Sequence, residues 1–162
     1  MTVGTTLGDV RYPSTVIGLV EPVNVTGNVE LTRYGLTQLP AKFGTVGGDF
    51  NCNGNKLTSL EGAPSHIGRQ FAFDDNCITS LVGIHKIIKS CKWIYLDSNP
   101  IKEGGLGLLL INGLTFIDFV QNNNSPHSSF EIIAKYLGKG KRGMIDCQTE
   151  LIKAGYKDFA KI

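Results

Sequence analysis

A short pattern of apolar and polar positions recurs five times along the chain. Its clearest copy has Phe50 and Cys52, two residues apart, followed by Asn55, Leu57 and Leu60. The other copies are Val29, Leu31, Tyr34, Leu36 and Leu39; Phe71, Phe73, Asn76, Ile78 and Leu81; Ile94, Leu96, Asn99 and Ile101; and Ile117, Phe119 and Asn122. Self-similarity at a period of 21 to 23 residues is typical of stacked structural repeats.

Each position of the pattern has a physical role in such a stack. Phe50 and Cys52 have the two-residue period of a β-strand, so both side chains point into the core. Asn55 lies where the chain leaves the strand, and its amide can bond backbone groups that a turn leaves unpaired. Asparagines of successive copies would then form a ladder. Gly62 and Pro64 favour a non-helical return path. We therefore expect successive strands to stack in parallel.

The spelling of this unit resembles that of a known family. Residues 47–64 read Gly-Gly-x-Phe-x-Cys-x-x-Asn-x-Leu-Thr-Ser-Leu-x-Gly-x-Pro, which is similar to the short leucine-rich-repeat proteins encoded by tailed bacteriophages. The resemblance covers residues 26–125. It implies a leucine-rich-repeat fold and a protein-binding scaffold, without naming a ligand.

The segments on either side of the repeats have different patterns. Residues 10–25 are rich in β-branched side chains and are broken by Gly18, which predicts a hairpin or strand pair that covers the first repeat. A short helix is expected within residues 82–91. After the last repeat, Ser128 and Glu131 have the spacing of a capping box. The residues after this box have helical periodicity, and a second helix is expected around Met144, Cys147 and Leu151.

The predicted fold is a leucine-rich-repeat solenoid of about five repeats of 21–23 residues, with a short parallel sheet on its concave face. Residues 1–25 form an N-terminal β cap, residues 26–125 the repeats and residues 126–162 a C-terminal helical cap. The three segments are expected to make one continuous structural unit.

Composition narrows the functional classes. A net charge of +2, with only 19% charged residues, gives no bulk attraction to nucleic acid or to a membrane. The four cysteines contain no C-x-x-C pair, which favours buried free thiols in a reducing compartment over a zinc site or a disulfide framework. The N-terminus lacks the features of a secretory signal, and no stretch is long and apolar enough for a transmembrane span. With the family resemblance, this indicates the cytoplasm of a bacterial host.

Several stretches look catalytic but have simpler interpretations. Gly47-Gly48-Asp49-Phe50 echoes a cyclic-dinucleotide synthase motif, yet it recurs as residues 68–71 and therefore belongs to the repeat. Residues 138–142, Gly-Lys-Gly-Lys-Arg, lack the spacing and the final Ser or Thr of a phosphate-binding loop. Cys147 follows Asp146, as in bacterial leucine-rich-repeat ubiquitin ligases, but the large catalytic domain of those enzymes is missing. We therefore predict no catalytic residue, no metal site, no cofactor and no enzymatic activity.

Residues that flank the two core positions point out of the predicted sheet, and they are the candidates for function. The candidate partner-binding residues are Glu30, Asp49, Asn51, Asn53, Asp74, Asp75, Trp93, Tyr95, Asp97, Phe116 and Asp118. Six of the outward residues are acidic and only Arg33 is basic, whereas the tail after residue 126 is rich in lysine. Trp93, Tyr95 and Phe116 form an aromatic group that is either an exposed binding anchor or is covered by the C-terminal helices.

The function predicted from these features is a non-enzymatic protein-binding module. Its acidic and aromatic concave face would dock a basic surface of a bacterial host protein, with no direct contact to nucleic acid or membrane. Inhibition of a bacterial defence enzyme, or of another nucleic-acid-handling enzyme with a positive groove, is the concrete version that the phage resemblance implies. The alternatives are a structural virion or assembly protein, and an effector enzyme with its chemistry in the C-terminal tail.

Overall fold

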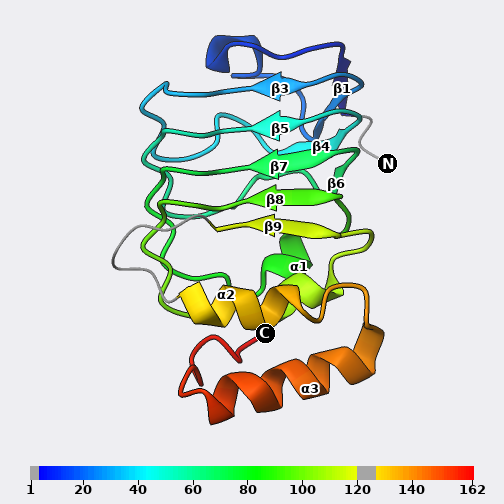
Figure 1. Ribbon diagram of the computed structural model, residues 1–162. Helices are drawn as coiled ribbons and strands as arrows, with labels where there is room; N and C mark the ends of the chain where they lie inside the picture. Colours follow the sequence, from blue (N-terminus) through cyan, green and yellow to red (C-terminus); the bar gives the residue numbers. More distant parts are fainter. Residues whose placement is uncertain (1–3, 120–126) are drawn as a thin grey trace.

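The computed structural model describes residues 4–119 and 127–162, which form two all-parallel sheets and three α-helices, an α/β fold (Figure 1). The four-stranded sheet has the order β1 (Thr5–Leu7), β2 (Val23–Val25), β4 (Phe43–Val46), β6 (His66–Ile67). The five-stranded sheet has the order β3 (Val29–Glu30), β5 (Phe50–Asn51), β7 (Gln70–Ala72), β8 (Trp93–Tyr95), β9 (Phe116–Asp118). From β2 onward the chain visits the two sheets alternately as far as β7.

The sequence period sets the register of the five-stranded sheet. The first apolar position of each copy pairs with the same position of the next: Val29 with Phe50, Phe50 with Phe71, Phe71 with Ile94, and Ile94 with Ile117. Because side chains alternate along a strand, this register stacks the recurring apolar residues on the core side of the sheet and turns their neighbours to the other side, where Ala72 is nevertheless buried. The parallel pairing predicted for these strands is confirmed.

The predicted leucine-rich-repeat solenoid, with a single sheet and a β hairpin at its start, is wrong. Phe43 and Val46 precede the recurring Gly-Gly and form β4 of a second parallel sheet, where the sequence suggested only a return path. The expected N-terminal β cap is also wrong, since Thr5 pairs in parallel with Val23 and β1 belongs to that second sheet. The first error arose because Phe43, Val46 and Ile67 were not counted as strand residues, although they are buried and extended. In the second, a strand pair was expected within residues 10–25, but the strand at Val23–Val25 pairs in parallel with residues 5–7.

Glycine allows the chain to turn from one sheet to the other. A Cβ atom on Gly68 would lie 1.8 Å from the carbonyl oxygen of Gly47, and one on Gly47 would lie 2.3 Å from that of Thr26. Only a residue without a side chain permits such close backbone approach. The first glycine of the pair is therefore required at the corner between the two sheets, whereas the second position is Arg69 in the next copy.

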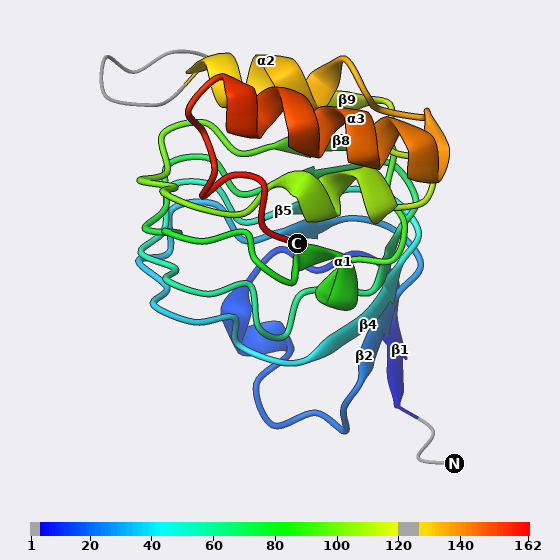
Figure 2. The same ribbon diagram turned by 90° about the horizontal axis from the view of Figure 1, so that it is seen from below.

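The helices gather at one end of the sheets (Figures 1 and 2). The α-helices are α1 (Ile84–Ile87), α2 (His127–Ala134) and α3 (Gly140–Lys153). The described residues also form two 3-10 helices, η1 (Pro13–Thr15) and η2 (Leu106–Leu110). The short helix in residues 82–91 and the two helices of the tail agree with the sequence prediction. The predicted capping box is wrong. Its serine would have to precede the helix, but α2 already begins at His127, so Ser128 lies inside the first turn.

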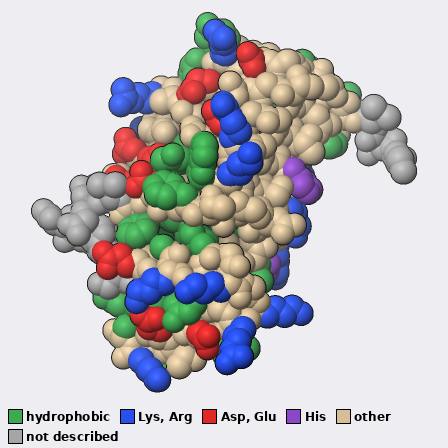
Figure 3. Space-filling model, turned by 45° about the vertical axis from the view of Figure 1, so that its right-hand side comes forward, with side chains coloured by type: hydrophobic (Ala, Val, Ile, Leu, Met, Phe, Trp, Pro, Cys, Tyr) green, Lys and Arg blue, Asp and Glu red, His purple; other side chains and the backbone are tan. Residues whose placement is uncertain are grey.

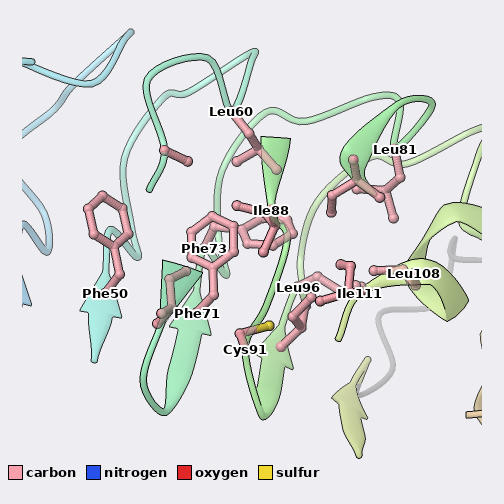
Figure 4. Close-up of a cluster of buried hydrophobic side chains, with 14 of the residues drawn as sticks. Phe50, Leu60, Phe71, Phe73, Leu81, Ile88, Cys91, Leu96, Leu108 and Ile111 are labelled. Carbon is pink, nitrogen blue, oxygen red and sulfur yellow. The ribbon is translucent and has the colours of Figure 1, made fainter. Parts of the chain in front are cut away.

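The core between the two sheets is continuous and aromatic in its centre (Figure 4). The ring of Phe50 lies edge-on to Phe43 of the other sheet, with centroids 5.0 Å apart, and to Phe71 of its own sheet at 5.7 Å. Phe71 in turn packs on Phe73 at 4.9 Å. These contacts join the sheets, and α2 extends the same core with the buried side chains of Phe130 and Ile133.

The predicted asparagine ladder is present. Asn76 accepts a hydrogen bond from the backbone N–H of Leu57 (3.0 Å) and donates to the carbonyls of Cys52 (3.0 Å) and Phe73 (2.9 Å). Asn55 and Asn99 bond equivalent groups one copy earlier and one copy later. Each amide thus satisfies buried backbone groups of two consecutive turns at once.

The cysteines are all free, and three of them are buried: Cys52, Cys91 and Cys147. The prediction of buried thiols is wrong for Cys77, which is exposed. Burial raises the pKa of the Cys52 thiol well above its ordinary range, that of Cys91 to about 12 and that of Cys147 to about 11. Among the described residues no group of three or more His, Cys, Asp or Glu could hold a metal ion.

Candidate protein-binding face

The candidate residues lie on or beside the outward side of the five-stranded sheet. Within β8 and β9 the alternation is plain: Ile94 and Ile117 are buried, while Trp93, Tyr95 and Phe116 turn away from the core. We call the whole set the acid–aromatic face. It comprises Glu30, Asp49, Asn51, Asn53, Asp74, Asp75, Trp93, Tyr95, Asp97, Phe116 and Asp118.

The aromatic group is exposed and is not covered by the C-terminal helices. Trp93 retains 40% of its accessible surface and Phe116 45%, although the two residues are paired on neighbouring strands. Tyr95 is half-buried, and its ring centroid lies 6.0 Å from that of Phe116 at a tilt of 60°. Of the two interpretations left open by the sequence, cover by the described C-terminal helices is therefore wrong, and the group is exposed.

A first ladder of side chains runs along the start of the strands. Asp9 Oδ1 accepts the backbone N–H of Asn28 (2.8 Å), Asn28 Oδ1 accepts that of Asp49 (2.9 Å), and Asp49 Oδ1 accepts that of Gln70 (3.3 Å). The carboxylate of Asp49 also forms an ion pair with the guanidinium of Arg69, with 2.6 Å between Asp49 Oδ2 and Arg69 Nη2. Asp49 therefore supports the sheet, and its charge is partly neutralised.

A second ladder runs along the ends of the strands. Asn51 Oδ1 accepts the backbone N–H of Asn53 (3.1 Å), Asn53 Oδ1 accepts that of Asp74 (2.7 Å), and Asp74 Oδ1 accepts that of Asp97 (2.9 Å). These bonds fix the polar side chains in place: the first is local, within one repeat, and the other two join successive repeats. Asn51, Asn53 and Asp74 thus hold the backbone together as well as facing outward.

The electrostatic centre of the face is a group of carboxylates around Asp74. Burial, the largest cause, and the negative charges of Asp118 and Asp97 raise the pKa of Asp74, against the backbone hydrogen bonds that lower it. Asp118 is paired in register with Tyr95, so these carboxylates adjoin the aromatic group. A cation placed beside Trp93 and Tyr95 would therefore meet both negative charge and aromatic rings.

The remaining acids are less central. Glu30 accepts hydrogen bonds from Asn51 Nδ2 (3.2 Å) and from the hydroxyl of Thr32. It lies on β3, four strands from β9, a distance of about 19 Å at the usual strand spacing. Asp75 is exposed, and its backbone has a φ of 52°. The structure thus brings Asp74, Trp93, Tyr95, Asp97, Phe116 and Asp118 together, and it places Glu30 at the far edge.

Three residues of this surface were missed in the sequence. Arg69 neutralises Asp49, and Asp9 and Asn28 begin the first ladder. The signal was available, since Asp9, Asn28 and Asp49 follow each other at 19 and 21 residues. The second spacing equals the repeat period and the first is two residues shorter, which marks them as structural positions.

Residues that could suggest catalysis are poorly placed for it. The Ser65 hydroxyl lies 2.8 Å from His66 Nδ1, but it also bonds the carbonyl of Gly44 (3.2 Å). If Ser65 donates to that carbonyl, it accepts from His66 and the imidazole is not placed to remove its proton. Cys147 is fully buried in α3 with a raised thiol pKa, which opposes the thiolate needed for nucleophilic attack.

Figure 3 shows a patch of hydrophobic side chains near the middle of the molecule, with carboxylates at its left edge and Lys and Arg side chains both above and below it. Comparison with known proteins does not identify the chain: no family model, no curated protein and no solved structure matches it significantly. No structural neighbour therefore supports the leucine-rich-repeat fold that the sequence predicted. Within the described residues, no helix has the length and hydrophobicity to span a membrane.

Proposed function

We propose that this protein is a non-enzymatic binding module whose acid–aromatic face docks a basic surface of a partner protein. The observation that carries the proposal is the exposed pair Trp93 and Phe116 beside the carboxylates of Asp97 and Asp118. Large aromatic side chains that are half exposed in the free protein can bury further area on binding. Such anchors typically contribute about 2 kcal/mol or more each when enclosed by a partner.

The rigid support of the face favours a preorganised surface. The two side-chain ladders bond Asp49, Asn53 and Asp74 to the backbone of the next repeat, so these side chains lose little freedom when a partner binds. The carboxylates would attract a positive surface over distances of about 10 Å at 0.1 M salt and speed its association. A partner with lysines or arginines around an apolar pocket fits this arrangement.

The finer prediction is that the partner is a bacterial defence enzyme, or another nucleic-acid-handling enzyme, that a phage protein inhibits in the host cytoplasm. It belongs to this proposal and depends on the sequence resemblance to phage proteins, together with the positive groove that enzymes of this kind present to nucleic acid. It does not follow from the geometry of the face.

The test is capture of a partner from bacterial lysate followed by calorimetry with the purified pair. Trp93→Ala with Phe116→Ala should weaken binding at least 30-fold, as expected from about 2 kcal/mol or more of lost contact. Asp97→Asn should slow association and reduce its salt dependence. Tyr12→Ala is the matched control, because it removes an exposed aromatic ring beside Glu30, at the opposite edge of the sheet from Trp93 and Phe116.

Unchanged affinity in the Trp93→Ala, Phe116→Ala variant, with its thermal unfolding also unchanged, would show that the partner binds elsewhere. Asp74 is better replaced by Asn than by Ala, because Asn keeps the oxygen that accepts the N–H of Asp97. Loss of binding then reports the missing charge and not a damaged sheet.

A further inference from the structure

The outward face of α3 is a second surface with exposed apolar side chains. Gly143, Cys147 and Leu151 face the core, whereas Ile145 and Ile152 keep 62% and 56% of their accessible surface. The two isoleucines are seven residues apart, so they lie on one side of the helix about 10.5 Å from each other. Nothing in the described part of the chain covers them.

This face is also positively charged. Lys141 and Arg142 precede Ile145, and Lys153 follows Ile152; all three are exposed and none makes an ion pair among the described residues. Elsewhere in the tail, Lys135 pairs with Glu150, and Lys161 pairs with Glu103 and Asp158. Lys139 and Lys157 also have no ion pair among the described residues, so three of the five such cations of the tail flank the exposed isoleucines. Asp146, next to Ile145, is the one exposed acid beside them within α3, so the local charge of this group is positive.

We propose that the outward face of α3 binds the acid–aromatic face of a second copy of this protein. The two surfaces are complementary, since Lys141, Arg142 and Lys153 bring positive charge where Asp97 and Asp118 bring negative charge. Each surface also has two large apolar side chains with little cover. Burial of Ile145 and Ile152 against Trp93 and Phe116 would remove apolar area from both copies at once.

A second copy accounts for both surfaces, which distinguishes it from other occupants. An anionic lipid surface would attract the lysines of α3, but it would leave the acid–aromatic face without a partner. The overall net charge of only +2 means that the positive and negative regions nearly cancel, so each copy that joins adds little net charge.

The contact would be head-to-tail. The strands of the five-stranded sheet present the acid–aromatic face on one side of the molecule, and α3 lies beyond the end of that sheet (Figure 1). The two faces of a single copy are therefore different surfaces, and their contact is heterologous. Unless the rotation between copies closes a ring, such contacts continue into open chains.

This inference shares the acid–aromatic face with the proposed function, but it needs no foreign partner. It adds a mode of regulation, because self-association hides the face that a foreign protein would bind. A basic partner and a second copy would then compete for the same residues, and partner binding would dissociate the chains.

The test is sedimentation velocity of the purified full-length protein at increasing concentration. We expect the weight-average sedimentation coefficient to rise with concentration, and to return toward that of a monomer when salt is raised from about 0.1 M to about 1 M, which shortens the Debye length from about 10 Å to about 3 Å. Lys141→Glu with Arg142→Glu should abolish the rise. These two positions are in the first turn of α3, where negative charge suits the helix dipole and the fold is retained.

The decisive experiment mixes two variants, each of which has lost one of the two surfaces. The α3 variant keeps its acid–aromatic face, and Trp93→Ala with Phe116→Ala keeps its α3 face, so each alone should be monomeric. Mixed in equal amounts, they should form a 1:1 dimer that grows no further. Lys42→Glu with Lys86→Glu makes the same charge change at exposed positions outside both faces and should associate like the wild type.

The proposal is overturned if the wild type remains monomeric up to about 1 mM, the weakest affinity of interest, or if the mixture gives no dimer. Vesicle binding through Lys141 and Arg142 by a protein that stays monomeric would assign α3 to lipid and would also overturn it. The proposed function is tested separately, since the α3 variant should still capture a foreign partner. If the Trp93→Ala, Phe116→Ala variant fails to capture a foreign partner and the α3 variant still captures it, the proposed function is supported whatever the sedimentation result.

Discussion

The asparagine ladder makes a quantitative prediction at Asn76, whose residue is only 6% exposed. Asn76→Ala removes the single acceptor of the buried Leu57 N–H and two hydrogen bonds to the carbonyls of Cys52 and Phe73. The carbonyls are not left unpaired, because Cys52 also accepts from Asn55 and Phe73 also accepts from Asn99. Only the N–H of Leu57 is orphaned.

The expected loss follows from these three bonds. An unsatisfied buried N–H costs about 1–3 kcal/mol, and each lost bond to a carbonyl that keeps another partner about 0.5–1.5 kcal/mol. The sum is about 2–6 kcal/mol, with about 4 kcal/mol as the central value. At this chain length that lowers the melting temperature by about 8–16 °C.

Urea unfolding followed by circular dichroism measures this change as a shift of the midpoint at constant slope. Asn112→Ala is the matched control: Asn112 is exposed, so its replacement should change the free energy of unfolding by less than about 0.5 kcal/mol. A loss below about 1 kcal/mol for Asn76→Ala would refute the role given to the ladder.

Three further predictions concern the face, the corner and the thiols. Because the folded state raises the pKa of Asp74, its ionisation opposes folding: the wild type gains stability below the unfolded pKa and loses it as pH rises through the folded pKa. Asp74→Asn should therefore be more stable than the wild type at pH 7, and urea midpoints should converge below about pH 4; a constant difference at both pH values would contradict this. Gly68→Ala should lower the free energy of unfolding by about 2–3 kcal/mol or more, since its Cβ would meet the Gly47 carbonyl oxygen at 1.8 Å, while Gly8→Ala, with no atom within 4 Å, should be nearly neutral. A thiol reagent at pH 8 should modify Cys77 alone in the folded protein and all four cysteines after unfolding, and reaction of a second thiol without unfolding would contradict the burial.

The register of the five-stranded sheet could be predicted because its information is local and periodic. Phe50 and Phe71 occupy the same position of a repeated pattern, and parallel pairing of equivalent positions stacks their apolar side chains. Asn55, Asn76 and Asn99 were predictable for the same reason, since a polar residue fixed within an apolar pattern needs buried backbone partners.

The second sheet was missed although it follows the same period. Val25, Val46 and Ile67 are buried, paired in register and 21 residues apart. The prediction counted one apolar-x-apolar pair per repeat, whereas these strands each contribute a residue outside that pair. These strands are stabilised by the core on one side and by the glycine-containing turns between the two sheets. Both forms of support exist only in the folded chain.

For the candidate face, the sequence indicated which residues point outward but not what they do there. Asp49 and Asp74 were assigned to binding on charge alone, and the structure gives both a hydrogen bond to the backbone of the next strand. The exposure of Trp93 and Phe116 depended on where α2 packs, which no pattern within the strands could reveal.

The parallel pairing also has a consequence for how the chain acquires its structure. Paired residues are separated by 18 residues between Thr5 and Val23, 21 between Val29 and Phe50, and 23 between Trp93 and Phe116. Parallel sheets usually join distant parts of a chain and form slowly, but here every closed loop is short. At a synthesis rate of about 5–20 residues per second, the partner of each strand leaves the ribosome within about 1–5 s of it. The sheets can therefore grow in the order of synthesis, from β1 toward β9.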